Sequence, residues 1–332
     1  MIRVAIIGLG DISKIHIRAI QNNPNAQLVA VCDIDCAHTN DVPHTTFYTD
    51  YNEMLRKESL DCVHICLPHY LHYPATKACV EAGVHVFQEK PVALNYQEAL
   101  KLLELEENNP HIKICICLQN RFNETFEKLV ELINSKKYGN VTGLKGLVTW
   151  YRPKQYYEVK PWRGQMEYAG GGAMINQSIH TLDLMQLIGG KVNAIKGHID
   201  NMLDLDIEVE DTALANIDFE NGVRGLYYAT TTYTSNSSVE IEVLTDEARF
   251  NIKDSILTII DNSGEETKVI EDTKLPGTKF YYGASHAKLI NYFYNTLETN
   301  SEDYIRVKDA IPSIRMIDMI RKSSELNQKV EF

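Results

Sequence analysis

A strand-like run, a glycine turn and a helix-like segment open the chain and constrain its fold more than any other feature. The run Ile2–Ile7 is rich in β-branched residues, as in a buried parallel strand. The turn Gly8–Ser13 follows, then a helical pattern to Gln21 and a second strand, Leu28–Cys32. Asp33 closes that strand. This order is typical of the dinucleotide-binding βαβ unit.

Each residue of this unit has an expected task. Gly8 serves the tight turn, and Gly10 lets the backbone approach a pyrophosphate at the helix N-terminus. Ser13 holds the third glycine position, which weakens the pattern, although serine is small enough for helix–strand packing. Asp33 is placed to accept hydrogen bonds from ribose hydroxyls, and its charge repels a 2′-phosphate, which favours NAD. The alternative is an ordinary acid at a strand end. The expected cofactor contacts here are Gly8, Gly10, Asp11, Ile12 and Asp33.

Strand and helix patterns keep alternating as far as residue 120. Further strands are predicted at Cys62–Leu67, His85–Gln88 and Lys113–Leu118, with helices at Tyr73–Ala82 and Asn95–Asn108. Such alternation predicts an α/β domain with a doubly wound parallel sheet over residues 1–120.

Polar clusters follow several of these strands. In doubly wound sheets, ligands bind at the carboxyl ends of the strands. We therefore expect further cofactor contacts from Leu67, Pro68, His69, His72, Glu89, Lys90 and Gln119.

The pattern changes in residues 121–332, where strands follow one another through short turns. Glu220-Asn221-Gly222 between two β-rich runs predicts a hairpin. Helical patterns occupy about Phe122–Lys137, Ala284–Glu298 and Lys308–Leu326. We expect a second, α+β domain with a large, mostly antiparallel sheet.

The stretch Gly170–Asp183 carries the candidate catalytic side chains of this second domain. Three glycines precede a predicted helix in which Asn176 and His180, four residues apart, share a face. The glycines would let a small molecule approach that face. His180 is a candidate general base because imidazole titrates near neutral pH, and Lys90 a fixed charge favouring a developing alkoxide. Asn176 would orient His180 or bind a substrate hydroxyl. The alternative is a capped helix with a buried, structural histidine.

An aromatic and basic loop, Trp150–Arg163, mixes flat rings with hydrogen-bond donors. This mixture suits a polyhydroxylated substrate, with any anionic group near Arg121, Arg152 or Arg163. An oligomer contact or plain surface is the open alternative.

Composition excludes several classes of protein. The 332-residue chain has a net charge of −12, which disfavours nucleic acid as a partner. Its seven cysteines lack metal-site or paired spacing and suggest reduced thiols in the cytoplasm. We expect no metal, no signal peptide and, with no apolar run of about 18 residues, no membrane span.

Several motifs together resemble the Gfo/Idh/MocA family, the glucose–fructose oxidoreductase and inositol dehydrogenase group. They cover nearly the whole chain: Gly8-Leu-Gly10, Leu67-Pro68 with His72, Glu89-Lys90-Pro91, Gln119-Asn-Arg-Phe-Asn123, Trp162-Arg163, and Gly170-Gly-Gly leading to His180 and Asp183. The resemblance implies NAD(P)-dependent oxidoreduction of a sugar, sugar derivative, cyclitol or other small molecule. It also implies a catalytic pair, Lys90 and His180, and a homodimer or homotetramer built through the open sheet face.

The resemblance leaves two departures and two alternatives. Ser13 replaces glycine or alanine, and Asn176 replaces the aspartate found four residues before the histidine in many members. One alternative is a non-catalytic NAD-binding regulator, against which the presence of Lys90 and His180 argues. The other is an oxidoreductase for a non-sugar molecule, as biliverdin reductase and dihydrodiol dehydrogenase are; the polar loop favours sugars. The expected substrate contacts are Arg121, Asn123, Tyr157, Trp162, Arg163, Asn176 and His180.

Overall fold

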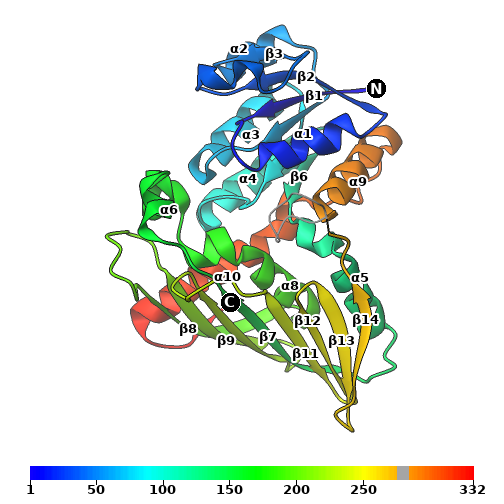
Figure 1. The fold of residues 1–332 in the computed structure, drawn as a ribbon, viewed down its shortest axis with the longest axis vertical. Coiled ribbons are helices and arrows are strands. Elements are labelled where there is room, and N and C mark those ends of the chain that lie inside the picture. The colour runs from blue at the N-terminus through cyan, green and yellow to red at the C-terminus, as the bar shows by residue number, and fades with distance from the viewer. Residues whose placement is uncertain (275–283) are drawn as a thin grey trace. The chain divides into compact units, whose positions relative to one another are not determined.

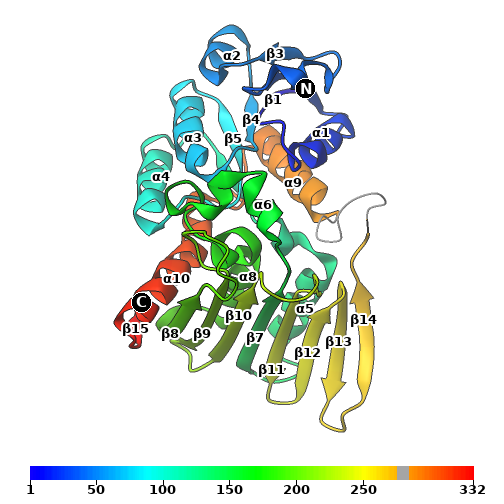
Figure 2. The same ribbon diagram turned by 60° about the vertical axis from the view of Figure 1, so that its left-hand side comes forward.

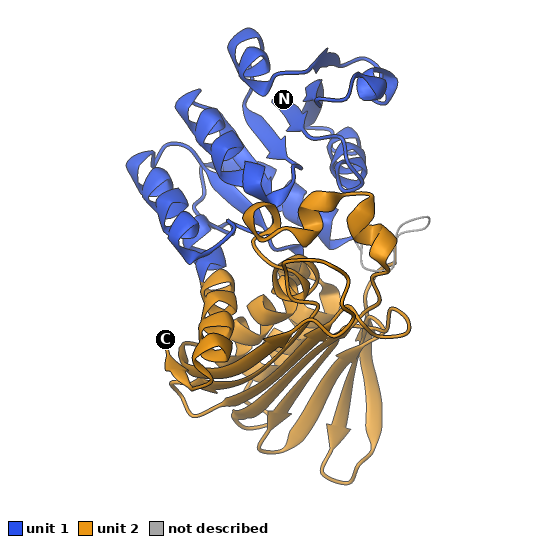
Figure 3. Ribbon diagram, turned by 90° about the vertical axis from the view of Figure 1, so that its left-hand side faces the viewer, with its two compact units in different colours: residues 1–119, 284–311 blue, residues 120–283, 312–332 orange. Residues whose placement is uncertain are grey.

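A computed structural model describes residues 1–274 and 284–332 of the chain. It divides into two compact units, coloured separately in Figure 3. Unit 1 comprises residues 1–119 and 284–311, and unit 2 comprises residues 120–283 and 312–332.

Unit 1 is built on a six-stranded parallel sheet in the order β3-β2-β1-β4-β5-β6. Figure 1 labels β1, β2, β3 and β6 of this sheet. Its strands are β1 (Ile2–Ile7), β2 (Ala26–Cys32), β3 (Thr46–Tyr48), β4 (Cys62–Ile65), β5 (His85–Glu89) and β6 (Ile114–Cys117). Its helices are α1 (Ser13–Gln21), α2 (Tyr51–Lys57), α3 (His72–Glu81), α4 (Tyr96–Asn108) and α9 (Ser285–Thr299). Strands β4 and β6 are buried throughout, as continuous apolar runs predict. The doubly wound sheet predicted from the sequence is confirmed.

The chain order reverses between β1 and β4, because β2 and β3 lie on one side of β1, and β4 to β6 on the other. This reversal is the switch point at which doubly wound sheets bind ligands.

Unit 2 contains a nine-stranded sheet in the order β14-β13-β12-β11-β7-β10-β9-β8-β15 (Figure 2). The strands are β7 (Val141–Thr149), β8 (Val192–Asp200), β9 (Thr212–Phe219), β10 (Arg224–Thr230), β11 (Glu240–Thr245), β12 (Ala248–Lys253), β13 (Ile256–Asp261), β14 (Glu266–Glu271) and β15 (Val330–Glu331). All neighbours are antiparallel except β7 and β10. The mostly antiparallel sheet is confirmed, and the predicted hairpin joins β9 to β10.

Helices cover one face of this sheet. They are α5 (Glu124–Asn134), α8 (Ile179–Gly189) and the part of α10 (Val307–Leu326) that follows residue 311. Two short helices, α6 (Lys154–Glu158) and α7 (Met166–Ala169), pack against the 3-10 turn Pro161–Gly164 between them. Glycine permits close packing of α8: a Cβ at Gly146 of β7 would lie 2.4 Å from Met185 Sδ. The other face is open, with Leu214, Leu226 and Leu244 all exposed.

Helix α9 departs from a simple division of the chain at residue 120. It was expected within the second domain, but it groups with unit 1. The physical reason is packing: α9 lies against α1, and its Tyr294 hydroxyl contacts His64 Nε2 at 2.8 Å. Strands β3, β12, β14 and β15 were not predicted individually.

Candidate active site

The turn after β1 has the geometry that the sequence predicts. Gly8 adopts φ +94°, and a Cβ there would lie 2.5 Å from the carbonyl oxygen of Cys66. Gly8 N donates to the carbonyl of Cys32 at 2.8 Å. The turn is thus held between the ends of β2 and β4, at the switch point of the sheet. Only glycine fits it without strain.

Asp33 is oriented by the same turn. One carboxylate oxygen accepts from Leu9 N at 2.7 Å and the other from Asp35 N at 2.9 Å. A carboxylate oxygen accepts more than one hydrogen bond, so both retain capacity for ribose hydroxyls.

Ser13 replaces the third glycine without disturbing the turn. Its side chain is buried, and its hydroxyl donates to the carbonyl of Gly10 at 2.7 Å. Asp11 and Ile12 lie between these residues, just before α1.

The residues after β4 connect two loops through the side chain of His72. His72, fully buried at the start of α3, has ring nitrogens 2.8 Å from the carbonyl oxygen of Pro91 and 2.9 Å from that of Leu67. Burial lowers the pKa of His72, although both carbonyl contacts act in the opposite direction. His69 is also buried, with its ring 5.8 Å from that of His72. This arrangement ties the loop after β4, containing Leu67 and Pro68, to the loop after β5.

The segment Glu89-Lys90-Pro91 ends β5, and its Lys90–Pro91 peptide is cis. Gln88 holds this segment through its side-chain amide, which donates to the carbonyls of Pro91 and Val92 at 3.1 and 3.0 Å. Lys90 is therefore presented from a tightly held loop.

Glu89 is a buried carboxylate whose Oε1 lies 2.9 Å from His16 Nε2. Burial by itself raises the pKa of Glu89, but the hydrogen bond and charge of His16, with His286 and Lys90, outweigh it. The pKa of Glu89 is held well below its usual range. Gln119, the last residue of unit 1 before residue 120, is buried and accepts from Cys117 Sγ at 3.7 Å.

In unit 2, Gly171 and Gly172 serve packing rather than an open approach to a ligand. A Cβ at Gly171 would lie 1.8 Å from Arg321 Nη2, and one at Gly172 would lie 1.9 Å from the carbonyl oxygen of Glu210. The space beside these two glycines is filled by unit 2 itself, which corrects the expectation that they admit a small molecule.

Two distant residues hold this glycine turn, and sequence reasoning missed both. Glu210 accepts from Met174 N at 3.1 Å through its carboxylate and from Ala173 N at 2.9 Å through its carbonyl. Arg321, on α10, donates to the carbonyl of Gly170 at 2.6 Å and lies 3.8 Å from the Glu210 carboxylate. Glu210 is 36 residues from Met174 and Arg321 is 151 residues from Gly170, so no local pattern could reveal them.

The helix predicted through Asn176 and His180 is interrupted. Residues Ala173–Gln177 form a π-helical turn, and α8 begins at Ile179. Ser178 N reaches the carbonyl of Ala173, five residues back, and the Ser178 hydroxyl bonds to that carbonyl and to the hydroxyl of Tyr227. Asn176 and His180 therefore belong to two different segments, which corrects the single helical face. Such π-turns are frequent at functional sites.

Asn176 contacts an aromatic side chain outside its own segment. Its side-chain amide and that of Gln177 donate to the Tyr156 hydroxyl at 3.1 and 3.2 Å. Tyr157, which the sequence favoured, is only 7% exposed, so Tyr156 is the residue of this pair that meets Asn176.

Two arginines flank Tyr156. The guanidinium carbon of Arg163 lies 4.1 Å from the Tyr156 ring centre, and that of Arg152 lies 5.3 Å from it. Trp162 lies beside Arg163, with 5.9 Å between ring centre and guanidinium. Neither arginine pairs with a carboxylate within residues 1–274 and 284–332, whereas Arg121 does.

Arg121 forms a bidentate ion pair with Asp183 of α8. Its Nε and Nη2 donate to the two carboxylate oxygens at 2.8 and 2.6 Å, and the Asp183 side chain is 2% exposed. Asn123 lies nearby in sequence as the residue before α5, and its side chain makes no capping hydrogen bond. The Asp183 carboxylate is thus engaged by Arg121.

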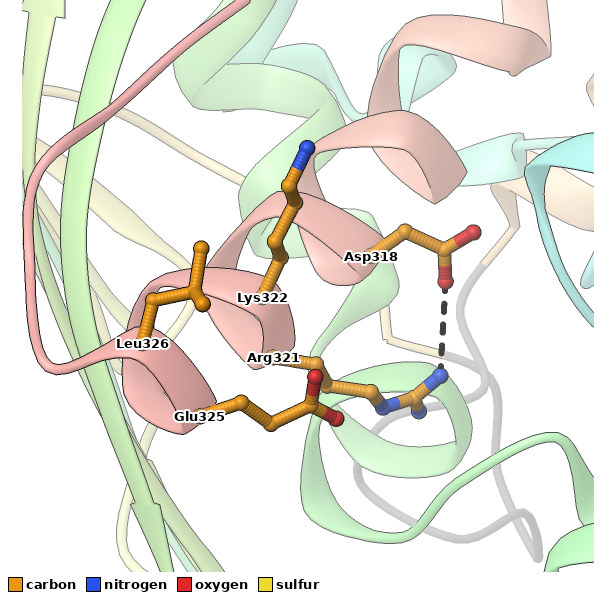
Figure 4. Close-up of a pocket in the computed structure, with 5 residues that line it drawn as sticks. All are labelled: Asp318, Arg321, Lys322, Glu325 and Leu326. Atoms are coloured by element: carbon orange, nitrogen blue, oxygen red, sulfur yellow. Dashed lines mark hydrogen bonds and ion pairs between the residues drawn. The ribbon is translucent and has the colours of Figure 1, made fainter.

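Figure 4 shows a hollow along α10, lined by Asp318, Arg321, Lys322, Glu325 and Leu326. It contains none of the residues that the sequence predicts for the site. Within the part of the chain that the structure describes, no helix combines the length and apolar character needed to cross a bilayer.

Family comparisons agree with both units. Residues 2–116 match the family model GFO_IDH_MocA, described as an oxidoreductase family with an NAD-binding Rossmann fold. Residues 126–251 match the GFO/IDH/MocA C-terminal domain.

Curated relatives are distant. Myo-inositol 2-dehydrogenase of Thermotoga maritima is 24% identical, with 79% of each chain covered, and D-glucoside 3-dehydrogenase of Escherichia coli is 26% identical, with 71% covered. An uncharacterized oxidoreductase of Synechocystis sp. is 26% identical over 66% of this chain, which spans 63% of that relative's length.

Solved structures match along the whole chain. The WlbA dehydrogenase of Bordetella pertussis, in complex with NADH and UDP-GlcNAcA, is 25% identical with a TM-score of 0.85, covering 100% of this chain and 98% of that one. A scyllo-inositol dehydrogenase of Lactobacillus casei with NAD(H) is 20% identical, with a TM-score of 0.83 and coverage of 100% and 99%; it supports the fold alone.

Proposed function

This chain belongs to the GFO/IDH/MocA oxidoreductase family, and on that premise we propose that it is an NAD-dependent dehydrogenase of sugar-like alcohols. The reaction moves a hydride between a secondary alcohol of a sugar, sugar derivative or cyclitol and the nicotinamide. The observation that supports this proposal is the turn at Gly8, in which Leu9 N donates to the carboxylate of Asp33, the proposed ribose-binding residue. NAD supplies the hydride acceptor, and the chain supplies binding, charge and proton transfer.

Lys90 and His180 are the proposed catalytic pair. The Lys90 ammonium stabilises negative charge developing on the substrate oxygen. His180, in the first turn of α8, takes the alcohol proton as a general base. The ring nitrogen must be unprotonated for this step, so oxidation is favoured as pH rises through the pKa of the base.

Asn176 and the Trp150–Arg163 loop are the proposed substrate contacts, with Tyr156 added to the residues that the sequence suggested. Arg152 and Arg163 favour a substrate with an anionic group, because their charges are not neutralised by a carboxylate in residues 1–274 and 284–332. Arg121 is a weaker candidate for such a group because Asp183 already engages its guanidinium. Relatives named for inositol and glucoside oxidation, and a WlbA neighbour bound to UDP-GlcNAcA, support a sugar-like class.

The open face of the unit 2 sheet is the proposed surface for a homodimer or homotetramer. Exposed Leu214, Leu226 and Leu244 lie on it. Lys145 on β7 pairs with Glu240 on β11 at 2.7 Å. Exposed leucines beside paired charges are suited to an interface in which the same sheet face of a second copy of the chain packs against this one.

A cytoplasmic location is also proposed. All seven cysteines are free thiols, and six of them are buried. Reduced, buried cysteines are usual in a reducing compartment.

The function is tested with purified protein, NAD and a panel of cyclitols, aldoses, glucosides and nucleotide sugars with and without a carboxylate. We expect NADH to form with at least one polyol or sugar, and faster with an anionic sugar. The His180→Ala variant is the control for contaminating activity. Tight NAD binding without turnover on any member of the panel would contradict the proposed reaction.

A further inference from the structure

A chain of buried polar side chains crosses unit 1 from α9 to the end of β5. The Tyr294 hydroxyl lies 2.8 Å from His64 Nε2, and His64 Nδ1 lies 2.8 Å from His16 Nδ1. His16 Nε2 in turn lies 2.9 Å from Glu89 Oε1. None of the four residues is more than 5% exposed, so water cannot replace a missing partner. We call these four residues the buried array.

All three hydrogen bonds of the array can form in either of two protonation states. An ionised Glu89 only accepts, so His16 Nε2 carries a proton. If His16 Nδ1 is bare, it accepts from His64, whose Nε2 then accepts from Tyr294. If His16 carries both protons, it donates to His64, whose Nε2 then donates to Tyr294. In either state all three hydrogen bonds are satisfied.

Other titratable groups surround Glu89. Its second oxygen accepts from the backbone N of Lys90 at 3.3 Å. The further titratable or charged groups that interact with it are the Lys90 ammonium, His286 of α9, Cys117 of β6, Cys66 after β4 and His72 of α3.

A metal ion is a poorer explanation of this cluster. Donor atoms of His16, Glu89 and Cys117 lie within 4.8 Å of one another. His16 and Glu89, however, contact each other at hydrogen-bond distance, and a cation between them would separate them. The geometry is that of a hydrogen-bonded array.

We propose that Tyr294, His64 and His16 are positioning residues that hold Glu89 in one orientation and, through it, position Lys90. The inference rests on the proposed catalytic role of Lys90. The hydrogen bonds of the three residues lead along the array to Glu89. Their effect passes through the Glu89 carboxylate, which meets His16 with one oxygen and the Lys90 backbone with the other. The array thus extends from helix α9 to the loop after β5.

The test is a double-mutant cycle between Tyr294 and Glu89. Tyr294→Phe removes one hydroxyl and keeps the ring, and we expect kcat to fall about fivefold to tenfold with little change in KM. In a Glu89→Gln background the same change should lower kcat no further, because Tyr294 acts through the carboxylate. An equal loss in both backgrounds, or wild-type kcat in Tyr294→Phe, overturns the proposal.

Tyr304→Phe is the matched control. Tyr304 is a buried tyrosine of the same unit, and its ring lies beside Lys113 and Arg306 rather than in the array. We expect kcat of this variant to stay at the wild-type value. If Tyr294→Phe lowers the yield of folded protein, His64→Gln provides a second break in the array, between His64 and His16.

A readout that does not need turnover separates this inference from the proposed function. We expect the amide resonance of Lys90 to shift in Tyr294→Phe and to stay in place in Tyr304→Phe. The shift should vanish when Glu89 is already glutamine. A wild-type enzyme inactive on every substrate contradicts the proposed function alone, whereas an unmoved Lys90 amide in Tyr294→Phe contradicts the array.

Discussion

The two glycine turns of this chain, at Gly8 and at Gly170–Gly172, solve different problems. At Gly8 the backbone bends with a positive φ, and its neighbours are Cys32, the last residue of β2, and Cys66, the residue after β4. At Gly171 and Gly172 the missing side chains make room for Arg321 and for the Glu210 backbone. The first turn forms part of the strand-end edge of the parallel sheet, and the second packs tightly beside the π-turn Ala173–Gln177.

The difference shows how each unit positions chemistry. Unit 1 places its candidate residues at strand ends, where the regular sheet determines their positions. Unit 2 places Asn176 on a π-turn and His180 at the start of the helix that follows it. The π-turn is supported by distant residues, Glu210, Arg321 and Tyr227. The predictions below test whether unit 1 serves the cofactor and unit 2 the substrate chemistry.

The largest expected effect separates binding from chemistry. His180→Ala should lower kcat by about 10²–10⁴-fold, because a general base is lost, while the Kd for NADH stays unchanged. Lys90→Ala should also lose most activity. His198→Ala, an exposed histidine on β8 of unit 2, is the control. Kinetics and NADH fluorescence titration measure the two effects, and wild-type turnover in His180→Ala would contradict the role of His180 as the base.

Next in size is the loss of stability when the Arg121–Asp183 pair is broken. Asp183→Asn should lower the free energy of unfolding by about 3 kcal/mol, because it removes the carboxylate that forms a bidentate pair with a nearly buried guanidinium. Glu131→Gln, which removes an exposed partner of Lys128, should cost less than about 0.5 kcal/mol. Urea unfolding compares the two variants. Equal, small losses would show that α8 is held by packing alone.

A smaller effect concerns the choice of cofactor in unit 1. Wild-type enzyme should prefer NAD to NADP, and Asp33→Ser should narrow that preference by at least about tenfold, since it removes the charge that repels a 2′-phosphate. Asp35→Ser removes a nearby acid and should leave the ratio unchanged. The measurement is kcat/KM for both cofactors. A wild-type preference for NADP would contradict the assignment of Asp33.

The smallest expected effect is a shift in pH dependence. A carboxylate near an imidazole favours the imidazolium and raises its pKa. Asn176→Asp therefore tests whether residue 176 approaches His180 across the break between their two segments, and an approach should raise the apparent pKa controlling alcohol oxidation by about one unit. The unprotonated histidine is the active form, so activity at low pH should fall. Asp183→Asn should leave the profile in place, because Arg121 engages that carboxylate. A shifted profile in Asp183→Asn together with an unchanged profile in Asn176→Asp would show that Asp183 is the carboxylate that raises the pKa of the base.

Much of unit 1 was predictable because its strands, helices and strand-end residues are each set by a short continuous stretch of sequence. Continuous β-branched runs become buried parallel strands, and each polar cluster follows a strand end. The role of Ser13 was harder to foresee, since only the structure shows its hydroxyl on the carbonyl of Gly10. The buried array was not predicted, because it joins α1, β4 and β5 to a helix more than 200 residues away.

Unit 2 was predictable in class but not in detail. Alternating strands and the Gly222 turn indicated an antiparallel sheet. The break between Asn176 and His180 was not visible, because residues 173–189 have an ordinary helical pattern. It forms because Ser178 bonds to the carbonyl of Ala173 and to Tyr227, while Glu210 takes the backbone of Met174.

By itself the sequence determined the βαβ opening, the order of strands and helices in unit 1, the class of unit 2 and the candidates Asp33, Lys90 and His180. These follow from local periodicity and from the backbone freedom of glycine, which act over a few residues. The tertiary structure decided the partners: Arg121 for Asp183, Tyr156 for Asn176, His16 for Glu89 and Arg321 for the glycine turn. Such pairs depend on burial, which makes an unpaired polar group costly, and burial is set only when distant segments pack together.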